Sequence, residues 1–454
     1  MSNLCPLDFR YGRKEMKAIF YEESRLQYQM DVEAALARAH ASLGTITKEQ
    51  ADEIGRVADL NVVKIERVKE IESETRHDVM AMVKAMTEQC KGDAGKFVHY
   101  GATSNDIVDT ATALQIKAAV ELIQADVDSF ILTLARLAKR ERDTIEIGRT
   151  HAQFAIPITF GFKISGYVEE MLRHRERLMQ AKSRACAGKM AGAVGTGAAL
   201  GPNFFRIQEA VMEDLGLTYE PAATQVVGRD RYTELVCLLA NIATSLERYA
   251  TEVRNLQRSE IGEAAEPFDR EKQVGSSTMA QKRNPMMSEN VCGLARIVRS
   301  MVTPMFESQV LWHERDLTNS STERFILPHT FVLLDEMFKK METVFGGLEV
   351  YPDRMLANIE SSRGLVMAES LMMRMTEKGI GRQDAHEIVR SSSMIAEDEN
   401  RHLRDVLLER EDLKGLMSAE DIVAAMDPAN YTGGSVEIVD RTVAKVEKVL
   451  GVRV

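Results

Sequence analysis

Proline is absent from two long stretches of this chain. None occurs between Pro6 and Pro157, and none occurs between Pro352 and Pro428. Proline lacks a backbone N–H and clashes with the preceding helical turn, so it interrupts helix interiors. Long stretches without proline therefore favour long helices.

Apolar residues recur along three segments at steps that alternate between four and three residues. This heptad spacing buries one seam of a helix against its neighbours at shallow crossing angles. The three stripes are Ile116, Val120, Ile123, Val127, Phe130, Leu134 and Leu137; Leu235, Leu239, Ile242, Leu246, Tyr249, Val253 and Leu256; and Met287, Val291, Leu294, Val298, Met301 and Met305. Residues 110–143 alone predict a helix about 50 Å long at 1.5 Å per residue. Because strand-like alternation is scarce, the sequence predicts an all-α fold with a central bundle of long helices.

Turn residues divide this helical pattern into three regions. We expect an N-terminal helical domain at 1–102, which ends near the turn at His99-Tyr100-Gly101. A central long-helix bundle is expected at 103–347, and a C-terminal helical domain at 348–454.

Charge and cysteine usage exclude several classes of protein. The chain has 58 Lys and Arg against 69 Asp and Glu, a formal net charge of −11, so a nucleic-acid binder is not expected. No uncharged apolar run approaches the roughly 18 residues of a membrane span, and the N-terminus lacks the apolar core of a secretory signal. The five cysteines are scattered and never form a CxxC pair. This usage predicts reduced thiols in the cytoplasm, without a disulfide framework or a metal site.

Two polar stretches begin or follow long helical segments. Residues 100–106 contain Thr103 and Ser104 at a helix start, where they either cap the helix or bind an anion, and both roles can hold together. Residues 148–153 contain His151 between Arg, Thr and Gln. Imidazole titrates near neutral pH, so this histidine is a candidate general acid, with a solvated structural histidine as the alternative.

Two further polar stretches lie later in the chain. Residues 274–285 combine small hydroxyl residues with Lys282 and a proline that can start a helix, a combination suited to binding carboxylates. Residues 313–324 carry two arginines around a hydroxyl-rich run, which predicts either carboxylate or phosphate binding or a solvated charged face. The Gly-rich run at 188–201 contains no GxGxxG and follows a helical pattern, so it predicts a close-packed turn and no dinucleotide site.

Together these stretches resemble the fumarase/aspartase superfamily, and within it the adenylosuccinate lyase family. The run GSSTMAQKRNP at 275–285 is similar to the superfamily signature GSSxMPxKxNP. The narrower resemblance extends over nearly the whole chain and is weakest after about residue 350. Its other motifs are Arg10-Tyr11-Gly12, Arg76-His77-Asp78, Thr103-Ser104-Asn105-Asp106, Arg149-Thr150-His151, Gln225 before Arg229, and the run from Glu314-Arg315 to Arg324.

The resemblance implies a fold, an assembly and a reaction. Family members are helical homotetramers whose long helices form a shared core and whose active sites draw on three subunits. Adenylosuccinate would be cleaved to AMP and fumarate, and the succinyl-carboxamide ribotide of purine synthesis would be cleaved in the same way. Both reactions are β-eliminations of a C–N bond that use no cofactor. The expected partners are a nucleotide substrate and further copies of this chain, with no membrane and no nucleic acid.

The resemblance also implies roles for the matching residues. Ser276 corresponds to the base, His151 to the general acid and Glu289 to the acidic residue that orients this histidine. Lys282 would favour loss of the serine proton, and Asn284 would hold a substrate carboxylate. His77 matches a histidine that contacts substrate and phosphate. The remaining substrate-binding matches are Arg10, Tyr11, Arg76, Asp78, Thr103, Ser104, Gln225, Arg315, Ser320 and Arg324.

Three positions depart from the family pattern. Ala280 stands where the signature usually has proline, Phe154 stands where His or Pro is frequent, and Asn290 stands where some relatives place a phosphate-binding arginine. Two other functions remain open. One is a sister lyase, such as an argininosuccinate lyase or a carboxymuconate cycloisomerase. The other is a catalytically silent structural protein of the same fold.

Overall fold

The computed structural model describes residues 4–269, 271–279 and 281–454, and these residues form two compact units. Unit 1 contains the described residues within 1–127, 174–246 and 293–339; unit 2 contains those within 128–173, 247–292 and 340–454. The long helices α7, α8, α10 and α13 contribute residues to both units. The predicted division at 102 and 347 concerns segments along the chain, and it stays a prediction.

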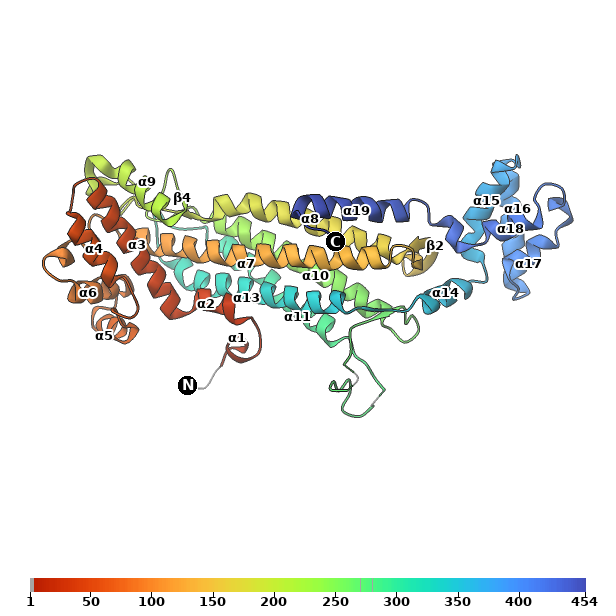
Figure 1. Cartoon of the computed structure of the whole chain (residues 1–454), viewed down its shortest axis with the longest axis horizontal. Coiled ribbons are helices and arrows are strands. Elements are labelled where there is room, and N and C mark those ends of the chain that lie inside the picture. Colours follow the sequence, from red (N-terminus) through yellow and green to blue (C-terminus); the bar gives the residue numbers. More distant parts are fainter. Residues whose placement is uncertain (1–3, 270, 280) are drawn as a thin grey trace. The chain divides into compact units, whose positions relative to one another are not determined.

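Helices dominate the described segments, and the all-α prediction is confirmed (Figure 1). The α-helices are α1 Pro6–Phe9, α2 Lys14–Phe20, α3 Glu22–Ser42, α4 Lys48–Val57, α5 Ile65–Thr75, α6 Asp78–Gln89, α7 Ser104–Arg140, α8 Phe160–Ala185, α9 Phe204–Leu215, α10 Asp230–Leu256, α11 Met286–Ser300, α12 Val302–Glu307, α13 Thr318–Gly346, α14 Pro352–Glu360, α15 Ala368–Glu377, α16 Arg382–Asp398, α17 Leu403–Leu408, α18 Ala419–Ala425 and α19 Ser435–Leu450. Short 3-10 helices are η1 Ala94–Phe97, η2 Ala198–Asn203, η3 Leu365–Met367, η4 Glu411–Leu413 and η5 Pro428–Tyr431. The strands pair as β1 Ile145–Thr150 with β2 Gln153–Thr159, β3 Ala187–Gly188 with β4 Thr218–Tyr219, and β5 Ala264–Ala265 with β6 Glu349–Val350.

The predicted apolar stripes form the buried seams of the long helices. Every residue of the first two stripes, on α7 and α10, is at most 4 % exposed. The third stripe differs, because α11 ends at Ser300 and a separate helix, α12, begins at Val302. Pro304 accounts for this break, since its ring would clash with the carbonyl of Ser300 if α11 continued.

Unit 1 has its own hydrophobic core around the N-terminal helices. Helix α3 packs against α4 and α9, and α5 packs against α6, as Figure 1 shows. Buried side chains such as Met30, Ile54 and Met82 fill the space between these helices. The Gly-rich run 188–201 forms close-packed turns, as predicted: a Cβ on Gly197 would lie 2.1 Å from the ring of Phe204.

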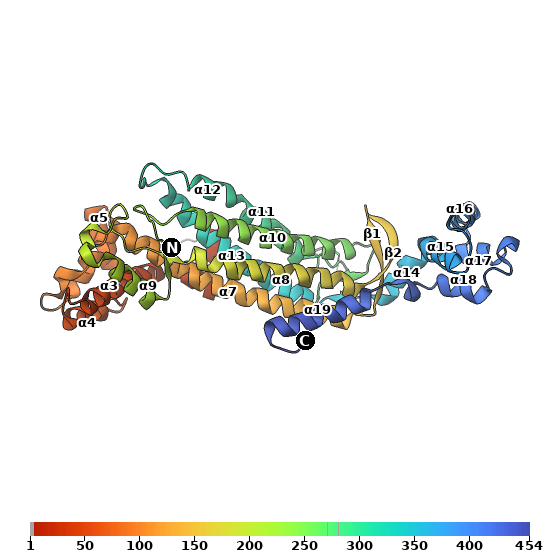
Figure 2. The same cartoon turned by 90° about the horizontal axis from the view of Figure 1, so that it is seen from above.

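The β1–β2 hairpin of unit 2 was not predicted, and it lies against α14 (Figure 2). Its two strands are antiparallel, and one extra residue in β2 bulges between Phe154 and Pro157. Helices α15 to α18 enclose a separate cluster of buried side chains that includes Leu371, Leu403 and Ile422. Among the described helices, none combines the length and the apolar character that a bilayer crossing requires.

Candidate active site

Eight of the predicted site residues line one cavity in unit 1, of about 540 Å³. They come from four stretches that are far apart in the sequence: the α5–α6 junction, the start of α7, the loop before α10, and the first turns of α13 with the segment before it. The eight residues are Arg76, His77, Asp78, Ser104, Gln225, Arg315, Ser320 and Arg324. We refer to this cavity as the arginine cleft.

Local backbone geometry orients the histidine of the arginine cleft. Arg76 ends α5 in the left-handed region, with φ of 53°, and His77 then caps α6. Nδ1 of His77 accepts a hydrogen bond from the N–H of Met80 at 3.3 Å, so the tautomer that fits this bond carries its proton on Nε2. Nε2 lies 3.4 Å from the hydroxyl oxygen of Ser104. His77 is therefore placed to donate a proton or a hydrogen bond beside the start of α7.

The arginine cleft holds more positive than negative charge. Asp78 lies between two arginines, 3.2 Å from Arg324 and 3.6 Å from Arg25. Arg315 donates a hydrogen bond to the Gln225 side chain at 2.8 Å, while its buried Nε has no hydrogen-bond partner among the residues that the structure describes. Burial, together with the nearby Arg324, lowers the pKa of Arg25. Four arginines line the cleft against three carboxylates, those of Glu72, Asp78 and Asp316, and the free N–H of Arg315 suits an anionic ligand.

Arg25 is a charged cleft residue that sequence reasoning missed. It lies within α3, where an arginine on a helix surface carries no motif and no unusual spacing. Only the packing of α3 beside the α5–α6 junction shows that its guanidinium reaches Asp78. No local sequence signal could have identified it.

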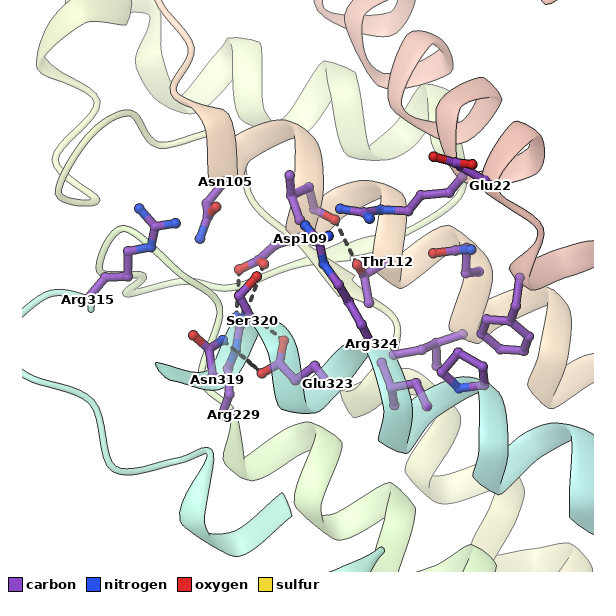
Figure 3. A pocket seen from close by; sticks show the side chains of 17 residues that line it. Glu22, Asn105, Asp109, Thr112, Arg229, Arg315, Asn319, Ser320, Glu323 and Arg324 are labelled. Carbon is purple, nitrogen blue, oxygen red and sulfur yellow. Dashed lines mark hydrogen bonds and ion pairs between the residues drawn. The ribbon is translucent and has the colours of Figure 1, made fainter. Parts of the chain in front are cut away.

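A second cavity, of about 330 Å³, shares residues with the arginine cleft and is shown in Figure 3. Arg229 lines this second cavity. Its guanidinium donates hydrogen bonds to the Asp109 carboxylate at 2.7 and 2.9 Å and to the Glu323 carboxylate at 2.9 Å. The carboxylates raise the pKa of Arg229 more than its burial lowers it. Because Asp109 lies on α7 and Glu323 on α13, this ion triad fixes the elements that carry Ser104 and Ser320.

Three predicted binding residues of unit 1 do not line the arginine cleft. Arg10 is exposed at the end of α1, and Tyr11 follows it. Thr103 precedes α7, and its N–H donates to Asp106 at 2.8 Å, as capping predicts. Asp106 is fully buried and pairs with the Lys189 ammonium at 2.5 Å. The substrate-binding roles of Arg10, Tyr11 and Thr103 stay predictions.

The signature segment of unit 2 gives Ser276 two backbone donors. Its hydroxyl oxygen accepts hydrogen bonds from the N–H groups of Thr278 at 3.3 Å and Met279 at 3.1 Å. The Asn284 amide donates to the Gly275 carbonyl at 2.9 Å, which closes the loop. Such N–H donors stabilise negative charge on the hydroxyl oxygen. Ala280 lies outside the described residues.

Three of the predicted residues that follow Ser276 line a third cavity, of about 700 Å³. Lys282, Asn284 and Glu289 face it together with Arg254 and other side chains of α10. Glu289 lies in the first turn of α11. The cavity therefore combines several cations, one carboxylate and a helix start, which is a suitable environment for an anion.

His151 lies at the tip of the β1–β2 hairpin. His151 and Ala152 are its two turn residues, with φ of 54° and 61°. Positive φ at both positions is typical of the tight hairpin turn that normally uses Asn-Gly. For residues other than glycine it costs about 1–2 kcal/mol each. The imidazole is exposed, and within the described part of the chain no hydrogen bond or ion pair joins it to Ser276 or Glu289.

Metal ligands do not gather anywhere in the described segments. Across 4–269, 271–279 and 281–454, no group of three or more His, Cys, Asp or Glu side chains could hold a metal ion. The arrangement found in the two units is one of cations, hydroxyls and imidazoles. It can bind an anionic substrate and move protons.

Comparisons with known proteins agree on a lyase. A family model described as "Lyase" matches residues 9–300, and a model described as "Adenylosuccinate lyase C-terminus" matches residues 364–442. The chain is 51% identical to the adenylosuccinate lyase of Pyrococcus abyssi over 98% of each chain. It is 46% identical to that of Methanothermobacter thermautotrophicus, over 98% of this chain and 99% of the relative.

Solved structures show the same fold at lower identity. The 3-carboxy-cis,cis-muconate lactonizing enzyme from Pseudomonas putida has a TM-score of 0.89 and 31% identity, over 99% of this chain and 100% of that one. A fumarate lyase from Mesorhizobium sp. BNC1 has a TM-score of 0.86 and 32% identity, over 95% of this chain and 97% of that one.

Proposed function

The chain belongs to the adenylosuccinate lyase family, and from this membership we propose that it cleaves adenylosuccinate to AMP and fumarate. The same site would release fumarate from the succinyl-carboxamide ribotide. In both substrates a succinyl group is attached through nitrogen. Its elimination needs a base at carbon, an acid at nitrogen and positive charge around the carboxylates.

The proposal assigns the proton transfers to two side chains of unit 2. Ser276, in its deprotonated form, takes the proton from the carbon beside one carboxylate. The C–N bond then breaks, its electron pair passes to nitrogen, and His151 gives a proton to that nitrogen. Lys282 and Asn284 hold the carboxylate that gains negative charge, and Glu289 orients His151.

The observation that best supports this function is the charge of the arginine cleft. The proposed substrates carry two carboxylates and a phosphate. Arg25, Arg76, Arg315 and Arg324 line the cleft beside His77, in a chain whose net charge is −11. A cluster of cations in an acidic protein focuses the field on one place, and this favours binding of a polyanion there.

The geometry at Ser276 also supports the assignment of the base. Serine is a weak base at its ordinary pKa, so it needs a setting that favours its anion. Its hydroxyl oxygen already accepts two backbone N–H groups, at 3.3 and 3.1 Å. The neighbouring Ser277 is exposed, and its hydroxyl lies 3.5 Å from the Thr278 hydroxyl, with no backbone N–H donor to it among the described residues. This contrast favours Ser276 over Ser277.

We further propose that the chain works as a homotetramer whose active sites are shared between subunits. Large apolar side chains on unit 1 are exposed, including Phe306, Val310, Trp312, Leu317 and Phe325. Large apolar side chains exposed to solvent are frequent at association sites. All five cysteines are free, which supports a cytoplasmic location, because reduced thiols persist there.

The sister reactions and the silent protein are the alternatives to exclude. Identity to the adenylosuccinate lyases reaches 51%, against 31% to the muconate enzyme, which favours the proposed substrate. The test is to mix the purified chain with adenylosuccinate and follow the change in purine ultraviolet absorbance. We expect conversion to AMP and fumarate in stoichiometric amounts. No absorbance change beside an active control enzyme would reject the proposal.

A further inference from the structure

The turn that carries His151 needs a support of its own. His151 and Ala152 both adopt a backbone conformation that glycine would take more easily. The hairpin has only two strands, and a bulge interrupts their pairing between Ile147 and Arg149, close to the turn. Isolated two-stranded hairpins are marginally stable in water. Something outside the hairpin therefore holds the imidazole in place.

Arg149, two residues before His151, connects the hairpin to a buried carboxylate. Its guanidinium donates two parallel hydrogen bonds of 2.7 Å to the two oxygens of Glu263, whose side chain is fully buried. The same guanidinium lies over the ring of Phe154, 5.4 Å from the ring centre. Phe154 is the residue opposite Arg149 in the strand pairing. The Arg149 side chain thus links both strands of the hairpin next to the turn.

Glu263 is itself held rigidly. The Asn358 amide of α14 donates to Glu263 at 2.7 Å, and the N–H of Tyr351 donates to its backbone carbonyl at 3.0 Å. Arg354 of α14 donates to the carbonyls of Glu260 and Ile261, at 2.8 and 2.9 Å. The carboxylate therefore occupies a fixed position against α14, and the bidentate geometry transmits that position to Arg149.

From these contacts we propose that Glu263 is a positioning residue for the reaction. Through Arg149 it fixes the strained turn and so sets where the imidazole of His151 meets the leaving nitrogen of the substrate. In this role Glu263 acts through Arg149 and not by contact with the substrate. This inference rests on the proposed function, in which His151 is the general acid. A small displacement of an acid group from its proton acceptor lowers the rate of the chemical step and leaves ground-state binding unaffected.

The kinetic test compares Glu263→Gln with a matched control. Asp440→Asn breaks a similar arginine–carboxylate fork in unit 2, with Arg142 at 2.8 and 2.9 Å, but there both side chains are substantially exposed. We expect Glu263→Gln to lower kcat by about 10- to 100-fold, with KM for adenylosuccinate within about twofold. Asp440→Asn should keep both constants. A wild-type kcat in Glu263→Gln, or a loss that appears only in KM, would overturn the proposal.

A second substitution distinguishes positioning from general stability. Ala152→Gly lowers the strain of the native turn, because glycine adopts positive φ readily. Added to Glu263→Gln, it should restore kcat by at least about threefold, since the native turn no longer depends on the support. The same substitution in the Asp440→Asn background should change kcat by less than about twofold. Equal effects in the two backgrounds would contradict the proposal.

Two further measurements guard against misfolding and against failure of the proposed function. Glu263→Gln leaves the buried guanidinium without its charge partner, so Arg149→Met/Glu263→Leu removes both charges together. In either variant, amide hydrogen exchange should accelerate in residues 145–159 and stay unchanged in α10. This readout needs no substrate. Even if the wild-type chain has no lyase activity, faster amide exchange in the hairpin of these variants would show that Glu263 stabilises it. Unchanged exchange would overturn the proposal, whatever the activity.

Discussion

At the scale of single residues, the two serines of the signature segment make different contacts. Ser276 accepts two backbone N–H groups, whereas the exposed Ser277 contacts one hydroxyl. We predict that Ser276→Ala lowers kcat by at least about 100-fold, because the acid–base step loses its base. His151→Ala should lower kcat by a similar factor, because the general acid is removed. Initial rates with saturating adenylosuccinate measure both.

The control for this prediction is Ser277→Ala. It removes a hydroxyl of the same type one residue away and should leave kcat within about threefold of wild type. Near-normal turnover in Ser276→Ala, or an equal loss in Ser277→Ala, would remove the base assignment from Ser276.

Arg25 provides a prediction about binding. Its guanidinium lies 3.6 Å from Asp78, and nearby Arg324 lies 3.2 Å from the same carboxylate. We expect Arg25→Gln to raise KM for adenylosuccinate by about tenfold, the effect of losing one charge-assisted hydrogen bond. Arg38→Gln is the matched control, because Arg38 lies on the same helix and pairs with an aspartate, Asp214, on the surface. An unchanged KM in Arg25→Gln would exclude Arg25 from the substrate site.

At the scale of elements, the β1–β2 hairpin carries a buried titratable group. Burial raises the pKa of Glu146 to about 7, even though the Lys163 ammonium of α8 lowers it. Glu252 of α10 and Glu263 also raise this pKa, and the Arg149 guanidinium lies 3.8 Å from the Glu146 carboxylate. The folded chain thus binds this proton more tightly than the unfolded chain does. The stability that the proton contributes is lost as pH rises from about 5 to about 7.

The variant Glu146→Gln tests the direction of this pH dependence of stability. Between pH 5.5 and pH 8, the unfolding free energy of wild type should fall by about 2 kcal/mol more than that of Glu146→Gln. This figure follows from about 1.4 kcal/mol for each pH unit between 5.5 and the raised pKa. Unfolding followed by circular dichroism at the two pH values gives this difference. The comparison between variants is needed because burial also raises the pKa of Asp126 to about 7. Equal losses in wild type and Glu146→Gln would contradict the prediction.

The hairpin also shows where sequence reasoning reached its limit. The long helices were predictable, because apolar spacing is repeated over many turns and each repeat strengthens the same conclusion. In the hairpin, Glu146 occupies a buried strand position and Pro157 lies inside the second strand. Its turn is formed by His151 and Ala152, with neither asparagine nor glycine. The isoleucines and threonines of both strands favour β structure, but the turn lacks its usual residues, so tertiary contacts decide that a hairpin forms.

At the scale of the whole molecule, the predicted site residues belong to both units. Motif resemblance named the residues of the arginine cleft because their types and order are specific. It could not name Arg25 or Glu263, whose roles depend on which helices lie beside them. The arginine cleft and His77 belong to unit 1, while His151 and Ser276 belong to unit 2. The proposed homotetramer predicts that these groups act on one substrate from different subunits.

Mixing two inactive variants tests that assembly directly. If one subunit supplies His151 and another supplies Ser276, random mixed tetramers of His151→Ala and Ser276→Ala contain sites with both groups intact. At equal proportions about one quarter of the sites should be complete, so activity should return to about a quarter of the wild-type value. The control for the mixing procedure is a chain with both His151→Ala and Ser276→Ala, mixed with the Asp440→Asn chain. In that mixture all intact groups come from one type of chain, so mixing creates no new complete sites. Absence of recovery in tetramers verified as mixed by mass spectrometry would show that His151 and Ser276 of each site come from one chain.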